Sequence, residues 1–169
     1  MDASTCSVRA SRLSEAPVTL TLRQSPHGPI INDVLGENAG KTPIAMWWAF
    51  LDTQNPILEG FYQLNRADTL GKMREAAAKV QAPGLNFVWA NARGDIGWWA
   101  AAQLPIRPAG VNPTFILDGA SPQADKLGFY PFSANPQQEN PARGYIVSAN
   151  YQPPSAVPVP GYYNLPDRG

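Results

Sequence analysis

The sequence is poor in the residues that most often form metal sites and catalytic triads. Its 169 residues include one cysteine, Cys6, and one histidine, His27. A single cysteine excludes an internal disulfide framework and any zinc site with several cysteine ligands. A Ser-His-Asp triad would need His27 as its base, yet this residue lies in a Pro-His-Gly-Pro turn, where a side chain is usually solvated. The composition therefore disfavours histidine-dependent and metal-dependent hydrolysis.

Charge and long apolar runs are also scarce. Charged residues make up 15% of the chain, and the thirteen basic residues balance the thirteen acidic ones. This balance excludes the broad basic surface needed for non-specific nucleic-acid binding. The longest apolar run, residues 44–51, is far shorter than the roughly twenty residues of a membrane-spanning helix. Residues 1–20 lack the apolar segment of a signal peptide. Hydrophobic residues still reach 44%, which is sufficient for a folded core.

The first half of the chain predicts a hairpin followed by a buried strand. Residues 1–16 are polar and predict an irregular leader. Residues 18–22 alternate with period two, and a turn at residues 25–29 leads to a return strand beginning at Ile30. The continuous apolar run at residues 44–51 predicts a strand that is buried on both faces.

Two amphipathic helices are expected next. Asn55-Pro56 is a helix start signal, because proline suits the first helical position. Apolar residues then recur at helical spacing through Leu64. Asp68 is predicted to cap a second helix, which Pro83-Gly84 terminates. Each helix should pack one face against a sheet, so the fold class is α+β.

The second half predicts a tight hairpin and a further strand. Residues 86–91 and 96–100 flank an Arg93-Gly94 turn, where glycine permits the positive φ of a hairpin. Residues 144–149 predict a short apolar strand that ends at Asn150.

Tryptophans occur in two adjacent pairs, Trp47-Trp48 and Trp98-Trp99. Neighbouring residues on a strand point to opposite faces, so one member of each pair would face the core and the other a second layer. A carbohydrate-stacking platform is the alternative, but aromatic residues at strand spacing mostly serve packing. The pattern thus favours a packed α and β domain.

Three segments in succession resemble a known family. They are residues 86–98, then Tyr130-Pro131-Phe132 with the following Asn-Pro pairs, and then residues 144–150. Their order and spacing resemble the β-chain of the penicillin acylase family, which includes penicillin, cephalosporin and acyl-homoserine-lactone acylases. His27-Gly28-Pro29-Ile30 and Leu64-Asn65-Arg66-Ala67 fit the same pattern. The resemblance extends from about Val18 to Asn150.

This resemblance implies an N-terminal-nucleophile hydrolase with a partial αββα sandwich of antiparallel strands and two packed helices. In such enzymes a precursor cuts itself, and the α-amino group of the exposed serine acts as the base, so no histidine is required. Acyl transfer passes through an oxyanion that needs positioned N–H donors. The position of Asn150 resembles that of the family's side-chain oxyanion donor, and a neutral amide offers two donors. A turn-capping asparagine is the alternative.

Three further positions take their expected roles from the family. Phe61 and Leu85 resemble residues that line its acyl-side pocket, where apolar side chains receive an apolar acyl group. Ordinary core packing is the alternative for both. Pro113 resembles a residue whose backbone carbonyl binds calcium in some members, although the carboxylates completing that site fall outside this chain. The resemblance requires no cofactor and leaves calcium as an expected ligand of the intact enzyme alone.

The resemblance also has gaps. The N-terminal serine, the backbone oxyanion donor and the α-chain have no counterpart in this sequence. We therefore expect residues 17–169 to be a partial penicillin-acylase-like β-chain domain, truncated at both ends and preceded by the irregular leader of residues 1–16. The isolated chain should be inactive. Family members are typically periplasmic or secreted.

The expected partners follow from these gaps. They are the α-chain and the N-terminal part of the β-chain, together with a small acylated amide substrate such as an acylated β-lactam nucleus or an acyl-homoserine lactone. Neither nucleic acid nor a membrane span is expected. A non-catalytic binding or structural module that uses the same sheet is the alternative function.

Overall fold

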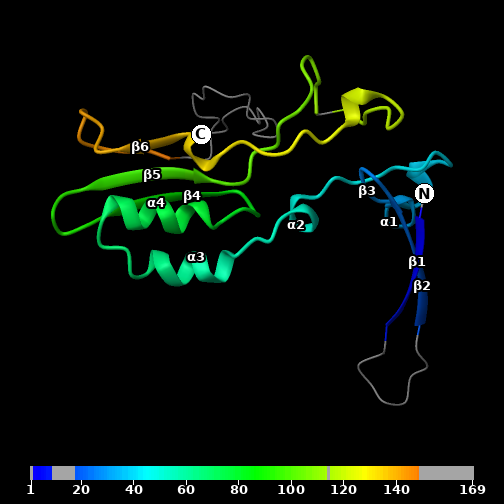
Figure 1. The fold of residues 1–169 in the computed structure, drawn as a ribbon, viewed down its shortest axis with the longest axis horizontal. Helices are drawn as coiled ribbons and strands as arrows, with labels where there is room; N and C mark the ends of the chain where they lie inside the picture. The colour runs from blue at the N-terminus through cyan, green and yellow to red at the C-terminus, as the bar shows by residue number, and fades with distance from the viewer. Residues whose placement is uncertain (1, 9–17, 114, 149–169) are drawn as a thin grey trace. The chain divides into compact units, whose positions relative to one another are not determined.

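The computed structural model describes residues 2–8, 18–113 and 115–148 (Figure 1). The chain divides after Trp48 into two compact units, residues 1–48 and 49–169. Within the described residues, no helix is long and apolar enough to cross a membrane.

The first unit is built on an antiparallel hairpin. Strands β1 (Asp2–Val8), β2 (Val18–Ser25) and β3 (Gly28–Pro29) form a three-stranded sheet in that order. The prediction of an irregular leader is wrong over residues 2–8, which form strand β1. Each of these residues pairs with β2, from Asp2 with Gln24 to Val8 with Val18. The sequence of β1 is rich in Ser and Thr and has no alternation of apolar residues, so the sequence alone does not predict a strand there. The pairing with β2 defines the strand.

The predicted turn after β2 is present but shorter than residues 25–29, since the return strand β3 is Gly28–Pro29 and does not begin at Ile30, which forms an isolated bridge with Ala45. The turn requires a glycine. The backbone N–H of His27 donates to the Ser25 hydroxyl at 3.2 Å, which closes the turn. Gly28 then has φ 132°, and a Cβ at this position would overlap the backbone carbonyl of Met46. The main chain at residue 46 thus lies directly against the turn, and the Met46 N–H donates to the Pro29 carbonyl at 2.9 Å.

The prediction of a buried strand over residues 44–51 is wrong. In this stretch Ala45 forms an isolated bridge with Ile30, and the chain then turns into the short helix α2 (Ala49–Asp52). Large apolar side chains here are exposed: Met46, Trp48, Phe50 and Leu51. A short apolar run does not distinguish a strand from a helical turn. Helix α1 (Asn32–Leu35) and the 3₁₀ turn η1 (Gly36–Ala39) precede this stretch.

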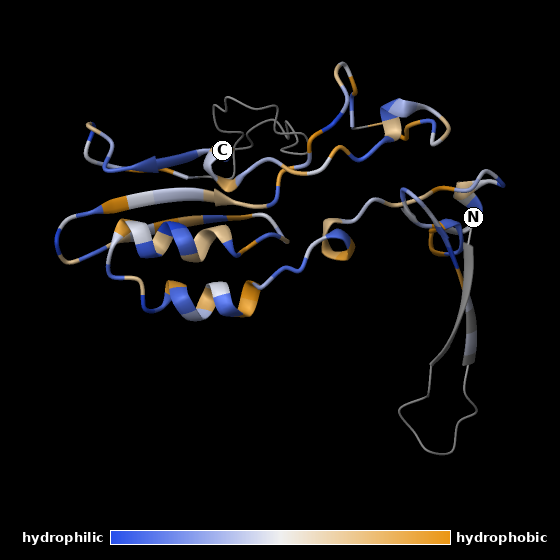
Figure 2. Ribbon diagram, in the orientation of Figure 1, coloured by the Kyte–Doolittle hydropathy of each residue, from blue (hydrophilic) through white to orange (hydrophobic). Residues whose placement is uncertain are grey.

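The second unit packs two helices and one antiparallel sheet in layers (Figures 1 and 2). Helices α3 (Ile57–Leu64) and α4 (Leu70–Ala78) precede strands β4 (Leu85–Ala90) and β5 (Ile96–Ala101). Strand β6 (Gln137–Glu139) completes the sheet, whose order is β4-β5-β6. The predictions of both helices and of the tight hairpin are confirmed.

Helix α4 begins one residue later than predicted. Its N-cap is Thr69, whose hydroxyl accepts a hydrogen bond from the Lys72 N–H at 3.3 Å. Asp68, the predicted cap, instead pairs with the Lys72 ammonium at 2.7 Å, one turn along the helix. That ion pair lowers the pKa of Asp68, with the Lys72 hydrogen bond as the largest cause.

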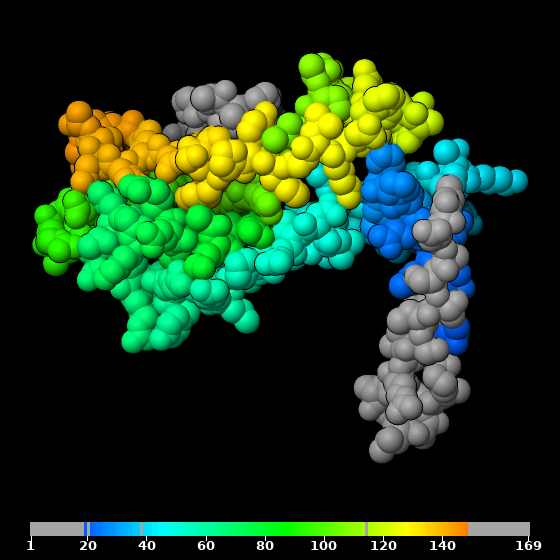
Figure 3. Space-filling model, in the orientation of Figure 1, coloured from blue at the N-terminus to red at the C-terminus, as the bar shows by residue number. Residues whose placement is uncertain are grey.

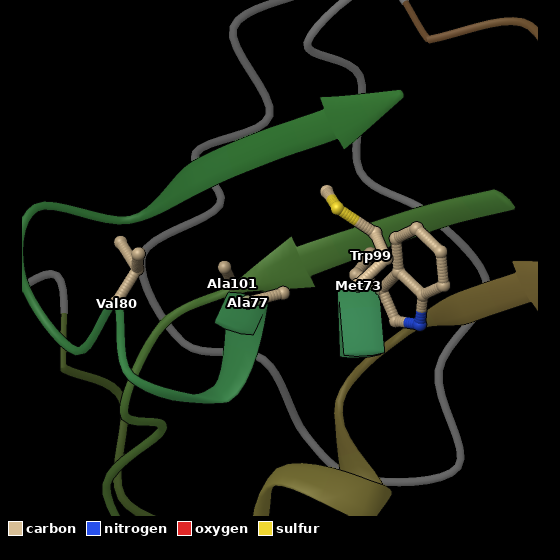
Figure 4. Packing of buried hydrophobic residues seen from close by; sticks show 5 residues of the cluster. All are labelled: Met73, Ala77, Val80, Trp99 and Ala101. Atoms are coloured by element: carbon tan, nitrogen blue, oxygen red, sulfur yellow. The ribbon is translucent and has the colours of Figure 1, made fainter. Parts of the chain in front are cut away.

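The core lies between α4 and the sheet. Five buried residues form it: Met73, Ala77, Val80, Trp99 and Ala101 (Figure 4). Three of these come from α4 or the turn after it, and two from β5. The small alanines let helix and strand approach closely. The space-filling view shows the helix layer and the strands in continuous contact at the surface (Figure 3). The hydrophobic effect of this interface holds the helix layer on the sheet.

Helix α3 packs beside α4 through a glycine. A Cβ on Gly60 would lie 3.2 Å from the Ala76 carbonyl oxygen and 3.2 Å from Cγ2 of Val80, so any larger residue would crowd both. Gly60 is buried accordingly. Both predicted helices therefore belong to one layer, in which α4 covers β5.

The pair Trp98-Trp99 behaves as predicted for a strand with two covered faces. Trp99 is fully buried in the core cluster, on the side of α4. Trp98 points to the opposite face and is 8% exposed, with its indole N–H donating to the Asn86 side-chain oxygen at 3.1 Å. Both rings serve packing, as the sequence pattern predicts.

The strand predicted for residues 144–149 is wrong over its described part. Residues 144–148 join no ladder within the part of the chain that the structure describes. The third strand is instead β6, a polar Gln-Gln-Glu segment that pairs with β5. The connection between β5 and β6 holds two 3₁₀ turns, η2 (Pro122–Ala124) and η3 (Phe132–Ala134).

Candidate functional site

Asn150, the predicted oxyanion donor, lies outside the described residues, so its role stays a prediction. The described structure does hold the segment that leads toward it. That segment begins with β6 and continues through a turn at residues 140–144 to Ser148. The contacts that fix β6 and this turn therefore define the candidate site.

Phe61 and Leu85 lie on the same side of the sheet. Phe61, on α3, meets the Phe87 ring edge to face, with centroids 6.0 Å apart and an interplanar angle of 77°. Leu85 opens β4 and packs against the core cluster, as does Phe87 two residues along the strand. Phe61 retains 39% exposure, which leaves apolar surface available. Phe61 and Leu85 could therefore line one side of a pocket for an apolar acyl group. That role stays a prediction.

Pro113 lies half-buried in a turn. Across residues 2–8, 18–113 and 115–148, no three His, Cys, Asp or Glu side chains gather where they could hold a metal ion. The described residues alone do not form a calcium site, and a carbonyl ligand at Pro113 would depend on carboxylates supplied from elsewhere. Calcium binding stays a prediction.

The hairpin motif at residues 86–98 has a structural explanation. The Asn91 side-chain oxygen accepts from the Arg93 N–H at 3.0 Å and from the Asp95 N–H at 2.9 Å, which closes the turn between β4 and β5. The Asn91 amide then donates to the Asp95 carboxylate at 2.8 Å. Hydrogen bonds from Asn140 and Asn91 lower the pKa of Asp95. Asp95 is therefore an ionised acceptor that stabilises the turn.

Asn140 connects this hairpin to the end of β6. Its side-chain oxygen accepts from the Ile96 N–H at 2.8 Å, and its amide donates to Asp95 at 2.9 Å. Its own backbone N–H donates to the Ile96 carbonyl at 2.9 Å. Asn140 adopts φ 43°, a left-handed conformation that asparagine tolerates better than most residues. The residue thus ends β6 at a fixed point beside β5.

Glu139 links β6 to β5 and to helix α4. Its carboxylate accepts from Trp99 Nε1 at 3.0 Å and from Arg74 Nε at 2.7 Å, while Arg74 Nη2 contacts the second oxygen. The two-point Arg74 hydrogen bond is the first cause that lowers the pKa of Glu139, and the Trp99 indole N–H adds to it. The same contact raises the pKa of Arg74. Sequence reasoning missed this network because its members lie far apart in the chain.

Asn135 fixes the other end of β6. It is 4% exposed, and its amide donates to the carbonyls of Ala100 and Ala102 at 2.9 and 2.7 Å. The Ala100 N–H donates to the Pro136 carbonyl at 3.0 Å, which extends the pairing with β5. The two Asn-Pro pairs that the sequence places before residues 144–150 thus secure β6 from both sides.

Comparison with known proteins identifies the family. The sequence model of penicillin amidases matches residues 3–169, nearly the whole chain. The chain belongs to the penicillin amidase family. The resemblance drawn from the three sequence segments is therefore confirmed.

Curated relatives carry two kinds of activity in their names. An acyl-homoserine lactone acylase, QuiP, of Pseudomonas aeruginosa is 26% identical over 158 residues, which cover 88% of this chain and 18% of the relative. QuiP of Pseudomonas fluorescens is 29% identical, over 80% of this chain and 17% of the relative. Penicillin G acylase of Escherichia coli is 28% identical, over 83% and 16% respectively. The chain thus spans less than a fifth of the length of these penicillin amidase relatives.

The fold agrees with this assignment. A thermostable penicillin G acylase from Alcaligenes faecalis superposes with a TM-score of 0.70 at 23% sequence identity, covering 96% of this chain and 28% of that chain. The helix layer over an antiparallel sheet is therefore part of the N-terminal-nucleophile hydrolase fold, as predicted. This confirms the α+β class and the partial αββα arrangement.

Proposed function

We propose that this penicillin amidase chain forms part of an amide hydrolase that acts by acyl transfer to an N-terminal serine supplied from outside the chain. The family match over residues 3–169 is the observation that carries the proposal. It includes the Gly144–Asn150 segment, whose last residue we assign as an oxyanion donor. The relatives are named as acylases, which supports hydrolysis of an amide that joins an acyl group to an amine.

The proposed chemistry needs no histidine base. The serine oxygen would attack the amide carbonyl while its α-amino group takes the proton. The C–N bond then breaks, the amine leaves with that proton, and water hydrolyses the resulting acyl-serine ester. Negative charge develops on the carbonyl oxygen in both steps. A neutral carboxamide at residue 150 would donate an N–H to that oxygen and would not itself lose a proton at physiological pH.

The substrate would present an apolar acyl group toward the sheet. Phe61, which contacts the Phe87 ring, and Leu85, which packs against the core cluster as Phe87 does, supply apolar surface on the helix-facing side of β4. Pockets that receive apolar groups are lined mainly by such side chains. The partners would be the remaining segments of the acylase precursor and a small acylated amide.

A comparison of the isolated chain with the complete gene product tests this proposal. The complete product of the reading frame that contains this chain should hydrolyse a chromogenic phenylacetyl or fatty-acyl anilide. Replacing Asn150 with alanine should lower kcat by about a hundred- to a thousandfold, as removal of one oxyanion donor does. The purified 169-residue chain should be inactive, because it lacks the nucleophile.

Two results would contradict the proposal. Turnover by the isolated chain that is lost in Asn150→Ala would show that the nucleophile lies within these residues. Full activity of Asn150→Ala in the complete product would exclude the oxyanion role. Sequencing the DNA upstream of Met1 is an independent check, because a frame that continues into a Gly-Ser junction supports the self-cleaving precursor, whereas a true start site supports a non-catalytic module.

A further inference from the structure

The sheet of the second unit has two edges of different character. Strand β4 forms one edge and β6 the other, with β5 between them. Strand β6 has the sequence Gln-Gln-Glu, and its Glu139 pairs with Arg74. Strand β4 has the sequence Leu-Asn-Phe-Val-Trp-Ala, without a charged residue, proline or glycine. Among the described residues, no strand pairs with the outer side of β4. The β6 edge is therefore polar and charged, whereas the β4 edge is uncharged and mostly apolar.

The hydrogen bonds of the hairpin show which backbone groups of β4 point outward. The Asn91 N–H donates to the Asp95 carbonyl at 3.0 Å, and the register of β4 and β5 places these two residues directly opposite each other. In an antiparallel ladder, hydrogen-bonded pairs alternate with pairs that are not hydrogen-bonded. Every second residue from Asn91 backward therefore bonds to β5. The N–H and C=O groups of Val88 and Ala90 point away from β5, toward the outer edge.

The side chains at this edge are exposed as well. Val88 is 59% exposed, and Ala90 is also exposed. Val88 lies opposite Trp98 of β5, which is only 8% exposed. The apolar face of β5 therefore continues onto an exposed apolar residue of β4.

Strand β4 lacks the features that protect a free edge. Proteins commonly protect such edges with charged side chains, proline or a β-bulge, because an unpaired apolar strand is a template for pairing with another strand. The sequence of β4 contains neither charge nor proline, and its register with β5 runs from Leu85 to Ala90 without a bulge. The strand thus has the properties of an interior strand of a larger sheet.

The family relatives indicate where a partner strand can come from. This chain covers 16–18% of the three curated acylases and 28% of the solved penicillin G acylase. Most of the length of each relative therefore lies outside the segment that this chain matches. A strand within the same polypeptide is present at a high effective concentration, whereas a second copy has to be recruited from solution. These two facts favour a segment of the same precursor over a second copy.

We propose that the outer edge of β4 binds an extended segment of the complete gene product from outside these 169 residues, which pairs with β4 as a further strand. The proposal rests on the function proposed above, in which the rest of the acylase precursor is supplied from outside the chain. The N–H and C=O groups of Val88 and Ala90 exchange hydrogen bonds with this segment. Its side chain beside Val88 is apolar, because directly opposed side chains on one face contact each other.

Hydrogen exchange in the complete gene product tests the pairing. Mass spectrometry with electron-transfer fragmentation resolves single backbone N–H groups. Those of Val88 and Ala90 should exchange about a hundredfold or more slowly than in an unstructured chain, as those of Phe87 and Trp89 should. The Gln137 N–H is the control, because the same alternation directs it outward from the polar edge of β6. It should exchange at close to the unprotected rate. Free exchange at Val88 and Ala90, or equal protection at Gln137, would overturn the proposal.

Photo-crosslinking identifies the partner. In the complete gene product, Val88 is replaced by the photoreactive benzoylphenylalanine, and irradiation should join it to a peptide from outside the 169 residues. Capture of a peptide from within these residues would overturn the proposal. A product of doubled mass that increases with protein concentration would assign the edge to a second copy, which also overturns it. Hydrogen exchange of the unsubstituted protein keeps the pairing testable if this variant does not fold.

Both measurements are independent of enzymatic activity, so they separate this proposal from the proposed function. If Asn150→Ala retained full activity while Val88 and Ala90 stayed protected, the oxyanion role would fail and the strand pairing would stand. If the two N–H groups exchanged freely in a product that hydrolyses the anilide, the strand pairing alone would fail.

Discussion

The indole of Trp99 lies over Gly97, two residues earlier on the same face of β5. A Cβ on Gly97 would lie 2.7 Å from Cζ3 and 2.8 Å from Cζ2 of that ring, well inside van der Waals contact. The ring is fully buried and packs in the core cluster with Met73 and Ala77 of α4, so it has little freedom to move away. The absence of a side chain at residue 97 is therefore a condition for burying Trp99.

Gly97→Ala should destabilise the fold by about 1–3 kcal/mol, because the added methyl forces the indole out of its position. Urea unfolding followed by tryptophan fluorescence measures the change. Gly71→Ala is the control, since a Cβ on Gly71 in α4 would contact nothing within 4 Å. Alanine should there stabilise the helix by about 0.5–1 kcal/mol. Equal effects of the two substitutions would contradict the proposed overlap.

Glu139→Gln should lower the free energy of unfolding by about 1–3 kcal/mol at neutral pH, because it removes the charge-assisted hydrogen bonds that join β6 to Trp99 and to Arg74 of α4. The pKa of Glu139 is lower in the folded state than its ordinary value of 4.5. Its contribution is therefore present above that value and is lost as the pH falls through the folded-state pKa. Unfolding free energies measured from pH 7 to pH 3 should decline less steeply in the variant.

Glu59, a carboxylate on α3, serves as the control for removing a side-chain charge. Glu59 pairs with Lys79 at 3.1 Å, but its side chain is 54% exposed. Exposed pairs of this kind contribute little, typically 0–1 kcal/mol. Glu59→Gln should therefore leave the free energy of unfolding at pH 7 close to that of the parent. A Glu139→Gln profile that matches the parent would rule out the network as a source of acid sensitivity.

Asn55→Ala should cost about 1–3 kcal/mol, because it leaves buried backbone groups without partners. The Asn55 side-chain oxygen accepts from the N–H groups of Gln81 and Ala82 at 3.2 and 3.0 Å, and its amide donates to the Ala82 carbonyl at 2.5 Å. The side chain thus pairs with the main chain as a strand would. Asn65→Ala, which removes one exposed hydrogen bond to Phe61, should change the unfolding free energy by less than about 0.5 kcal/mol.

Thr69→Ala should destabilise α4 by about 0.5–2 kcal/mol through loss of its N-cap, and Thr69→Ser should retain most of that contribution. Asp68→Ala removes an exposed ion pair with Lys72 and should have a smaller effect. The unfolding temperatures of the three variants show which substitution destabilises the fold most. A larger loss for Asp68→Ala than for Thr69→Ala would reassign the cap to the residue that the sequence first suggested.

The elements that were predicted correctly are those specified by neighbouring residues. The Arg93-Gly94 turn between β4 and β5 acts over a few positions. The Asn55-Pro56 signal precedes α3 as predicted, although Pro56 is the N-cap instead of the first helical residue, and Asn55 also pairs with Gln81 and Ala82. The cap of α4 illustrates the limit of such reasoning, because Asp68 and Thr69 are both good capping residues. The choice between them depends on the backbone angle at which the chain enters the helix.

The elements that were missed depend on distant partners. Strand β1 is polar and exists through pairing with β2, and β6 is a Gln-Gln-Glu segment held by Trp99, Arg74 and Asn135. The apolar runs at residues 44–51 and 144–149 have the composition of strands. Whether such a run forms a strand depends on a neighbouring strand with which it can pair, and composition does not predict that neighbour. The candidate site followed from the family resemblance, whereas the contacts of Glu139 and Asn140 required the fold.

Gly28 and Gly97 exclude a side chain for different reasons, and this difference has an evolutionary consequence. Gly28 lies against a backbone carbonyl, that of Met46, which every amino acid possesses. No exchange at residue 46 can therefore make room for a larger residue at 28. Gly97 lies against an indole, so a smaller residue at 99 could accommodate alanine at 97. Among homologues, residues 97 and 99 should covary, whereas glycine at 28 should be invariant without any compensating partner.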